Sequence, residues 1–141
     1  MHEYHYEVAS ALRVFAHQNN VTTIVNAHPV TEAMRKVFFK GHQYEGMPMP
    51  PNAADVEGGG KWSSRSDCFV VIHRYAASET DWIYTHIHVR KVKEMESGGR
   101  ITPLESRLIL QSVLGNVGFV INGRNLLPIK LDETPQSDVP F

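Results

Sequence analysis

Apolar residues recur every three or four positions near the start of the chain, which is the pattern of an amphipathic helix. This pattern covers residues 4–16, and the run Gln18-Asn19-Asn20 is expected to end the helix. Residues 21–27 are β-branched and apolar, as in a buried parallel strand, and His28 with Pro29 stops that strand. A helix followed by such a strand indicates one step of a parallel α/β sheet.

The central segment, residues 55–74, combines a glycine loop, a short helix and a strand. One carboxylate and three glycines come first, and residues 61–67 then have the length of a short helix. The apolar run 68–72 has the length of a buried strand and closes on His73 and Arg74. Ligands of open α/β sheets bind outside the carboxyl ends of strands. The loop before this segment and the residues after it are therefore where we expect the site.

The remaining pattern is mostly β and loop. Residues 81–93 alternate as a strand, with Tyr84, His86, His88 and Arg90 on one face. The other expected elements are a short helix at 31–39, a long loop at 40–52, a turn at 76–80, a polar turn at 94–99, a loop with a helical turn at 102–110, a strand at 117–121, a hairpin turn at Asn122-Gly123 and a return strand at 126–129.

Composition fits a single domain at residues 1–131, followed by a disordered acidic tail at 132–141. The net charge of -1 excludes a uniformly basic nucleic-acid coat but allows a local basic patch. The one cysteine, Cys68, lies in an apolar run, so we expect a reduced core residue and neither a disulfide framework nor a cysteine-based zinc site. No signal peptide or membrane-spanning apolar stretch is evident, so a cytoplasmic location and no membrane partner are expected.

Two groups of histidines are candidates for chemistry. His28 ends an expected strand, with Asn26 two residues earlier, and could contact a phosphate or a water; it could equally only cap the strand end. His86 and His88 share one strand face, and with His73 alongside they could bind a metal. The alternative is that the three are partly buried, hydrogen-bonded polar residues.

A group of cations follows at the end of the same strand. Lys91 and Lys93 share one face, and Arg90 lies on the other. Two aligned cations suit a phosphate, but they also suit a solvated basic edge that blocks further strand pairing. Gly60-Lys61 does not complete a P-loop, because Trp62 stands where serine or threonine is needed, and no complete P-loop occurs in the chain.

The order and spacing of these pieces resemble the RecA-like motor of hexameric replicative DNA helicases of the DnaB/Twinkle type, phage and bacterial, over roughly residues 8–99. The family has an aspartate, a glycine-bearing loop, a short helix, a Ser-Asp or Ala-Asp pair, an apolar strand and often a closing arginine. The matching residues are Asp55, Gly58, Gly60, Ser66-Asp67, 68–72 and Arg74. The resemblance implies an α/β fold, the C-terminal portion of a RecA-like P-loop ATPase core, with a mostly parallel sheet continuing into antiparallel strands.

The resemblance also implies roles. In the complete protein, a hexameric ring, ATP with Mg would contact His28, Arg74, Lys91 and Lys93. His28 would sense the γ-phosphate, and Lys91 and Lys93, with Arg90, would reach into the neighbouring subunit and stabilise charge during phosphoryl transfer. Single-stranded DNA would be held by Lys40, Gly41, His42, Glu57, Gly58, Gly60, Lys61 and Arg65.

This sequence departs from the family pattern in three ways. Lys93 replaces an arginine, which removes bidentate phosphate contact, and Glu57 replaces a frequent arginine. The P-loop and Walker-B strands are absent, so the chain corresponds to the C-terminal half of the motor and is expected to be inactive alone. Two other classes stay open: a non-catalytic RecA-like adaptor that binds DNA or a helicase, and a metal-dependent β-rich enzyme built on the three histidines.

Overall fold

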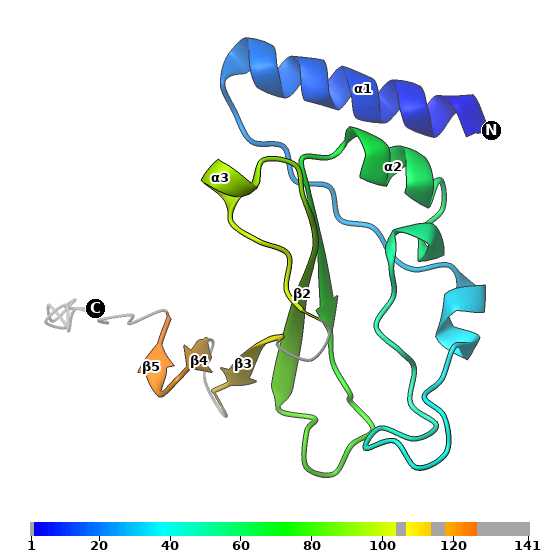
Figure 1. Cartoon of the computed structure of the whole chain (residues 1–141), viewed down its shortest axis with the longest axis vertical. Coiled ribbons are helices and arrows are strands. Elements are labelled where there is room, and N and C mark those ends of the chain that lie inside the picture. The colour runs from blue at the N-terminus through cyan, green and yellow to red at the C-terminus, as the bar shows by residue number, and fades with distance from the viewer. Residues whose placement is uncertain (1, 104–106, 114–117, 127–141) are drawn as a thin grey trace, which may run out of the picture.

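The computed structural model describes residues 2–103, 107–113 and 118–126 (Figure 1). The expected tail at 132–141 and most of the expected return strand lie outside these residues. The elements in chain order are α1 (His2–Asn19), the 3-10 turns η1 (Thr31–Arg35) and η2 (Ala53–Asp55), α2 (Gly59–Arg65), β1 (Cys68–His73), β2 (Tyr84–Val92), α3 (Met95–Gly98), β3 (Leu108–Ser112), β4 (Phe119–Ile121) and β5 (Arg124–Asn125).

Over the described residues, the sheet has five strands in the order β1-β2-β3-β4-β5, and every neighbouring pair is antiparallel. Parallel neighbours need a crossover of a dozen or more residues, usually a helix. Here each strand instead pairs with the next strand along the chain, and the link between β1 and β2 is only residues 74–83. The predicted mostly parallel, RecA-like P-loop ATPase core is therefore wrong.

The predicted strand at residues 21–27 is also wrong. This segment runs alongside the α2 end of the molecule without pairing into the sheet (Figure 1), and Ile24 is 84% exposed. Its first described strand-like contact comes later, at the single bridge between Pro29 and Val56. β-Branched residues favour a strand only where a neighbour offers backbone partners and a packing surface, and no described strand pairs with 21–27.

The N-terminal helix is confirmed, and so is its expected end. Asn20 adopts a left-handed conformation with φ of 50°, and the Val21 N–H donates to the Ala16 carbonyl at 3.1 Å. Figure 1 shows α1 lying across α2 at one end of the sheet. The Arg65 guanidinium lies 4.2 Å from the centre of the Tyr6 ring, which joins the two helices. None of the helices in the described part of the chain is long and apolar enough to span a membrane.

The β1–β2 hairpin confirms that His86 and His88 share a face, whereas a bulge opposite Phe69 and Val70 interrupts the predicted alternation at Arg90. His73 pairs with His86, and Val71 pairs with His88, so these side chains share one face of the sheet. Cys68 is exposed rather than in the core, which corrects that prediction. β1 is the first strand of the described sheet and has a strand partner on one side only. Two of its apolar residues, Val70 and Ile72, are 49% and 70% exposed.

The interior of the described part of the chain is small and includes several polar side chains. Its buried apolar residues are Ala9, Ala33, Tyr44, Val71, Tyr75 and Leu110, and its buried polar residues are Asp55, Thr85, His86 and His88. Leu110 belongs to β3, where a loop with a helical turn was predicted. The Asn122-Gly123 hairpin turn is confirmed, with both residues at positive φ as a type I′ turn requires.

The start of α2 gives a prediction about stability. A Cβ added at Gly59 would lie 1.7 Å from the Ala53 carbonyl oxygen, whereas one added at the next residue, Gly60, would meet nothing within 4 Å. We expect Gly59→Ala to lower the free energy of unfolding by more than about 3 kcal/mol, because backbone cannot make room. Gly60→Ala should raise it by about 0.5–1 kcal/mol. Urea titration measures both variants, and equal effects would contradict this packing.

Candidate functional site

A groove of 380 Å³ lies between residues 29–51 and the end of β1. Its lining is almost entirely apolar, and three methionines contribute to it. The lining residues are Pro29, Ala33, Met34, Met47, Pro48, Met49, Pro51, Ile72, His73, Arg74, Tyr75, Ala76 and Ala77. We call it the methionine groove. The loop before the central segment and the residues after its strand, where the sequence placed the site, therefore meet in one groove.

The wall of the groove is a covering loop, residues 36–51, that folds over the end of the sheet. Backbone hydrogen bonds close it, from the Phe38 N–H to the Met47 carbonyl at 3.0 Å and from the Met49 N–H to the Lys36 carbonyl at 2.7 Å. Tyr44, at its middle, is buried and stacks on Tyr75 with ring centres 3.6 Å apart. This aromatic contact fixes the covering loop against the residues that follow β1.

His73 and Arg74 are the only lining residues that can carry a charge. The Arg74 Nη2 atom donates to the Trp82 carbonyl at 2.6 Å, which holds this exposed side chain at the rim. The His73 ring bonds to the Pro48 carbonyl, and burial lowers its pKa. Its Nε2 atom has no hydrogen-bond partner among the described residues.

Exposed aromatic rings accompany cations on the two segments that form the groove. Phe39 is 73% exposed and precedes Lys40 in the covering loop, and Trp82 is 43% exposed beside Arg74. The Gln43 amide donates to the Asp81 carboxylate at 3.3 Å, which ties the two segments together. The groove therefore has an apolar interior with aromatic and cationic groups on the segments that bound it.

Asp55, the aspartate of the family motif, has a structural role. It is only 4% exposed, accepts from the Asn52 N–H at 2.8 Å and receives a hydrogen bond from the Lys36 ammonium. The Lys36 hydrogen bond, followed by the Asn52 bond, holds the pKa of Asp55 below its usual value. Together these contacts join the covering loop to η2 and cap that turn.

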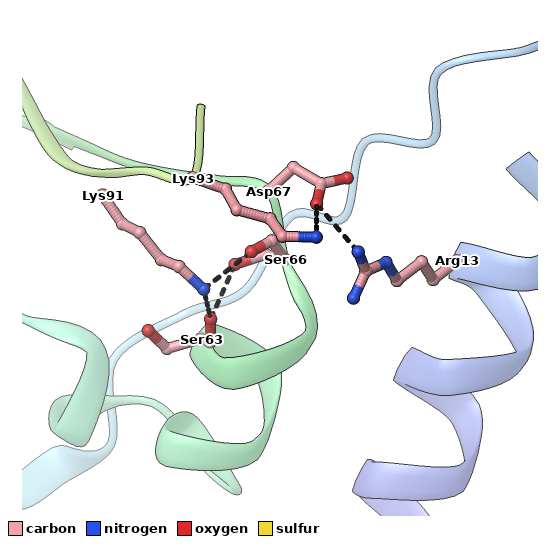
Figure 2. Close-up of polar contacts among 6 residues, drawn as sticks. All are labelled: Arg13, Ser63, Ser66, Asp67, Lys91 and Lys93. Atoms are coloured by element: carbon pink, nitrogen blue, oxygen red, sulfur yellow. Dashed lines mark hydrogen bonds and ion pairs between the residues drawn. The ribbon is translucent and has the colours of Figure 1, made fainter. Parts of the chain in front are cut away.

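The predicted phosphate-binding lysines are used within the fold. Lys91 donates from Nζ to the carbonyls of Ser63 and Ser66, so it caps the C-terminal end of α2 (Figure 2). The Lys93 ammonium lies 3.7 Å from the Asp67 carboxylate, and the Arg13 guanidinium forms an ion pair with the same carboxylate at 3.5 Å. Lys93 remains about half exposed, but Lys91 is not presented to a ligand in this arrangement.

The predicted DNA-binding residues separate into two groups. Lys40, Gly41 and His42 lie in the covering loop, on a segment that forms the groove. The others, Glu57, Gly58, Gly60, Lys61 and Arg65, lie in or next to α2. There, Glu57 is 3.9 Å from His5 and a Cβ at Gly58 would meet the His5 ring, so these positions pack on α1. His28 is exposed and adjoins Pro29 of the groove in sequence.

The three strand histidines share one face of the sheet, and His73 has a hydrogen bond of the predicted kind, whereas His86 and His88 do not. His86 is 1% exposed and His88 3% exposed, and neither ring has a hydrogen-bond partner among the described residues. Burial, followed by the charges of Arg90 and Arg107, lowers the pKa of His88 to about 4. Within the described ranges, no group of three or more histidine, cysteine, aspartate or glutamate side chains is arranged to hold a metal ion.

Three residues of this site were missed by sequence reasoning: Tyr44, Tyr75 and Arg107. An aromatic residue in a long polar loop, and another directly after a strand, were the available signals for the tyrosines. Arg107 offered no signal, because its segment was not expected to pair with β2. Comparison with family models, curated proteins and solved structures finds no match to this chain. The helicase resemblance thus stays a prediction.

We expect the buried histidines to make the folded state less stable in acid. Because the pKa of His88 is lower in the folded state than its usual 6.5, the unfolded chain binds more protons below pH 6.5. The free energy of unfolding should therefore fall by about 3 kcal/mol between pH 6.5 and pH 4. Urea titrations across this range measure it. His88→Leu should flatten the dependence, and His17→Gln, a change at an exposed helix residue, should not. A flat wild-type profile would contradict the prediction.

Proposed function

We propose that the chain is a non-catalytic binding module for single-stranded DNA and that the methionine groove is its binding site. The observation that carries this proposal is an apolar groove formed by two segments that also bear exposed aromatic rings and cations. Proteins that bind single strands combine stacking platforms with positive charge along the backbone path. Phe39 and Trp82 supply the platforms, and Lys40 and Arg74 supply the charge.

The groove suits one unstacked base. Its proline and alanine side chains give flat, apolar walls, and methionines adapt to rings of different size. A phosphate next to that base would meet Arg74, whose guanidinium is held by the Trp82 carbonyl and keeps further N–H donors for the ligand. The other polar side chains that line the groove are His73, whose ring is bonded to the Pro48 carbonyl, and Tyr75, which is stacked on Tyr44. The site would therefore bind bases mainly by stacking and burial.

This role corresponds to the adaptor alternative rather than to a motor. The sequence has no P-loop, and Lys91, one of the two expected finger lysines, caps α2 instead. ATP with Mg and a hexameric ring remain predictions of the helicase resemblance, a cytoplasmic location remains a prediction from the sequence, and binding to DNA requires none of them. The motor hypothesis has its own test. If a polypeptide with the upstream half of the motor is added and ATPase activity appears, and if Lys93→Ala abolishes that activity, the motor would be supported instead.

Oligonucleotide binding tests the proposal. We expect a labelled oligo(dT) to bind the chain in fluorescence anisotropy titrations, and Trp82→Ala to weaken binding roughly 5- to 100-fold through lost stacking. Arg74→Gln should weaken binding and reduce the slope of log affinity against log salt by about 0.7, the value for one phosphate contact on a single strand.

The matched control is Arg124→Gln, which removes an exposed cation from β5 and should leave affinity unchanged. Circular dichroism confirms that each variant is folded. Failure of the wild-type chain to bind oligo(dT), or equal losses for Arg74→Gln and Arg124→Gln, would contradict the groove as a DNA site.

A further inference from the structure

A second polar cluster is formed by two residues of β2 and one residue just before β3. It consists of His88, Arg90 and Arg107, none of which lines that groove. Arg90 is the extra residue of a β-bulge, since Phe69 pairs with Lys91 and Val70 pairs with Val89. A bulge re-aims the side chain that it carries. Arg107 directly precedes β3, whose first residue, Leu108, pairs with Ile87, so the antiparallel register places Arg107 beside His88.

The cluster contains buried hydrogen-bond donors without acceptors. Both ring nitrogens of His88, the Arg90 Nε and the Arg107 Nε are inaccessible to solvent and have no hydrogen-bond partner in the described part of the chain. A guanidinium Nε always carries a proton, and a neutral imidazole carries one. Each buried donor that stays unpaired lowers the stability of the folded state by about 1–3 kcal/mol. An acceptor bound at this cluster would remove that cost.

The full positive charges that act on His88 are the guanidinium groups of Arg90 and Arg107. The groups that act on it are Arg90, Arg107, His86 and His73, and each of them lowers its pKa. The negative charge of Asp81 acts on His86, the neighbour of this cluster on β2, and tends to raise its pKa. The Asp81 carboxylate is already bonded to Gln43 and Tyr44, and Arg107 donates to the Tyr44 hydroxyl at 3.3 Å. Tyr75 stacks on Tyr44 and adds no negative charge at neutral pH.

We propose that His88, Arg90 and Arg107 form a binding site for a phosphate group. A tetrahedral oxyanion offers acceptors in several directions and can take the two forked guanidinium groups and the imidazole together. It would also supply the negative charge that this cluster lacks. The phosphate can come from free inorganic phosphate or from a nucleic-acid strand, and the two sources share this chemistry.

The first test follows the imidazole signals by NMR during titration with inorganic phosphate, at ionic strength held constant with chloride. His88→Gln assigns the signal of His88. We expect a saturable shift of that signal, together with a rise of its pKa toward 6.5, because a bound anion favours the protonated ring. Arg90→Gln and Arg107→Gln should each weaken the apparent affinity at least tenfold, while Arg124→Gln should leave it unchanged.

Lysine variants provide a second comparison if a glutamine variant does not fold. Arg90→Lys and Arg107→Lys keep the charge but lose the forked geometry, and should weaken phosphate binding less than the glutamine changes. Arg74→Gln, which affects the methionine groove, should leave the phosphate shift intact. Failure of the DNA proposal and failure of this one are therefore distinguishable.

The second test distinguishes the sources of the acceptor. If oligo(dT) shifts the His88 signal and inorganic phosphate does not, the site takes phosphates of a strand; if inorganic phosphate suffices, it takes the free anion. Glu105 lies outside the described residues and is close in sequence to Arg107. A phosphate shift that appears only in Glu105→Gln would mean that this carboxylate fills the cluster and would overturn the proposal. No saturable shift with either ligand would also overturn it.

Discussion

The antiparallel pairing of β1 with β2 is the constraint on which the other features depend. Its register places His73 beside His86 and Val71 beside His88, which creates the buried polar face. The same pairing brings Lys91 to the end of α2, where its ammonium satisfies two carbonyls (Figure 2). The bulge in this pair places Arg90 beside His88. A one-residue slip would move all of these side chains to the opposite face.

The positively charged residues fall into two groups, according to whether contacts within the fold satisfy their donors. Lys91 and Lys36 are engaged by carbonyl and carboxylate oxygens within the fold, so they stabilise the joins between elements. Arg74 is fixed at one nitrogen only, and Arg90 and Arg107 each keep a buried donor without an acceptor in the described residues. These three arginines are the ones to which we assign ligand binding, because a ligand oxygen would satisfy their free donors without breaking a contact within the protein.

Local elements were largely predictable, and the sheet was not. α1 with its asparagine cap, α2, the strand β2 and the Asn122-Gly123 turn each depend on neighbours in sequence, and each was found near its predicted bounds. Residues 21–27 have the composition of a parallel strand but found no partner strand among the described residues. The sequence pointed to two segments as places for a site, but it did not predict that they meet in a groove. The stacking of Tyr44 on Tyr75, which holds the covering loop in place, joins positions far apart in the chain.

By itself, the sequence determined the shared face of His86 and His88, the end of α1 and the Asn122-Gly123 turn, because these properties follow from periodicity and backbone preference. Only the tertiary structure decided that the sheet is antiparallel, that Lys91 caps a helix, and that Arg107 joins His88 and Arg90. The physical reason is that strand partners and buried donors are selected by packing and hydrogen bonding between distant segments, which local sequence patterns do not encode.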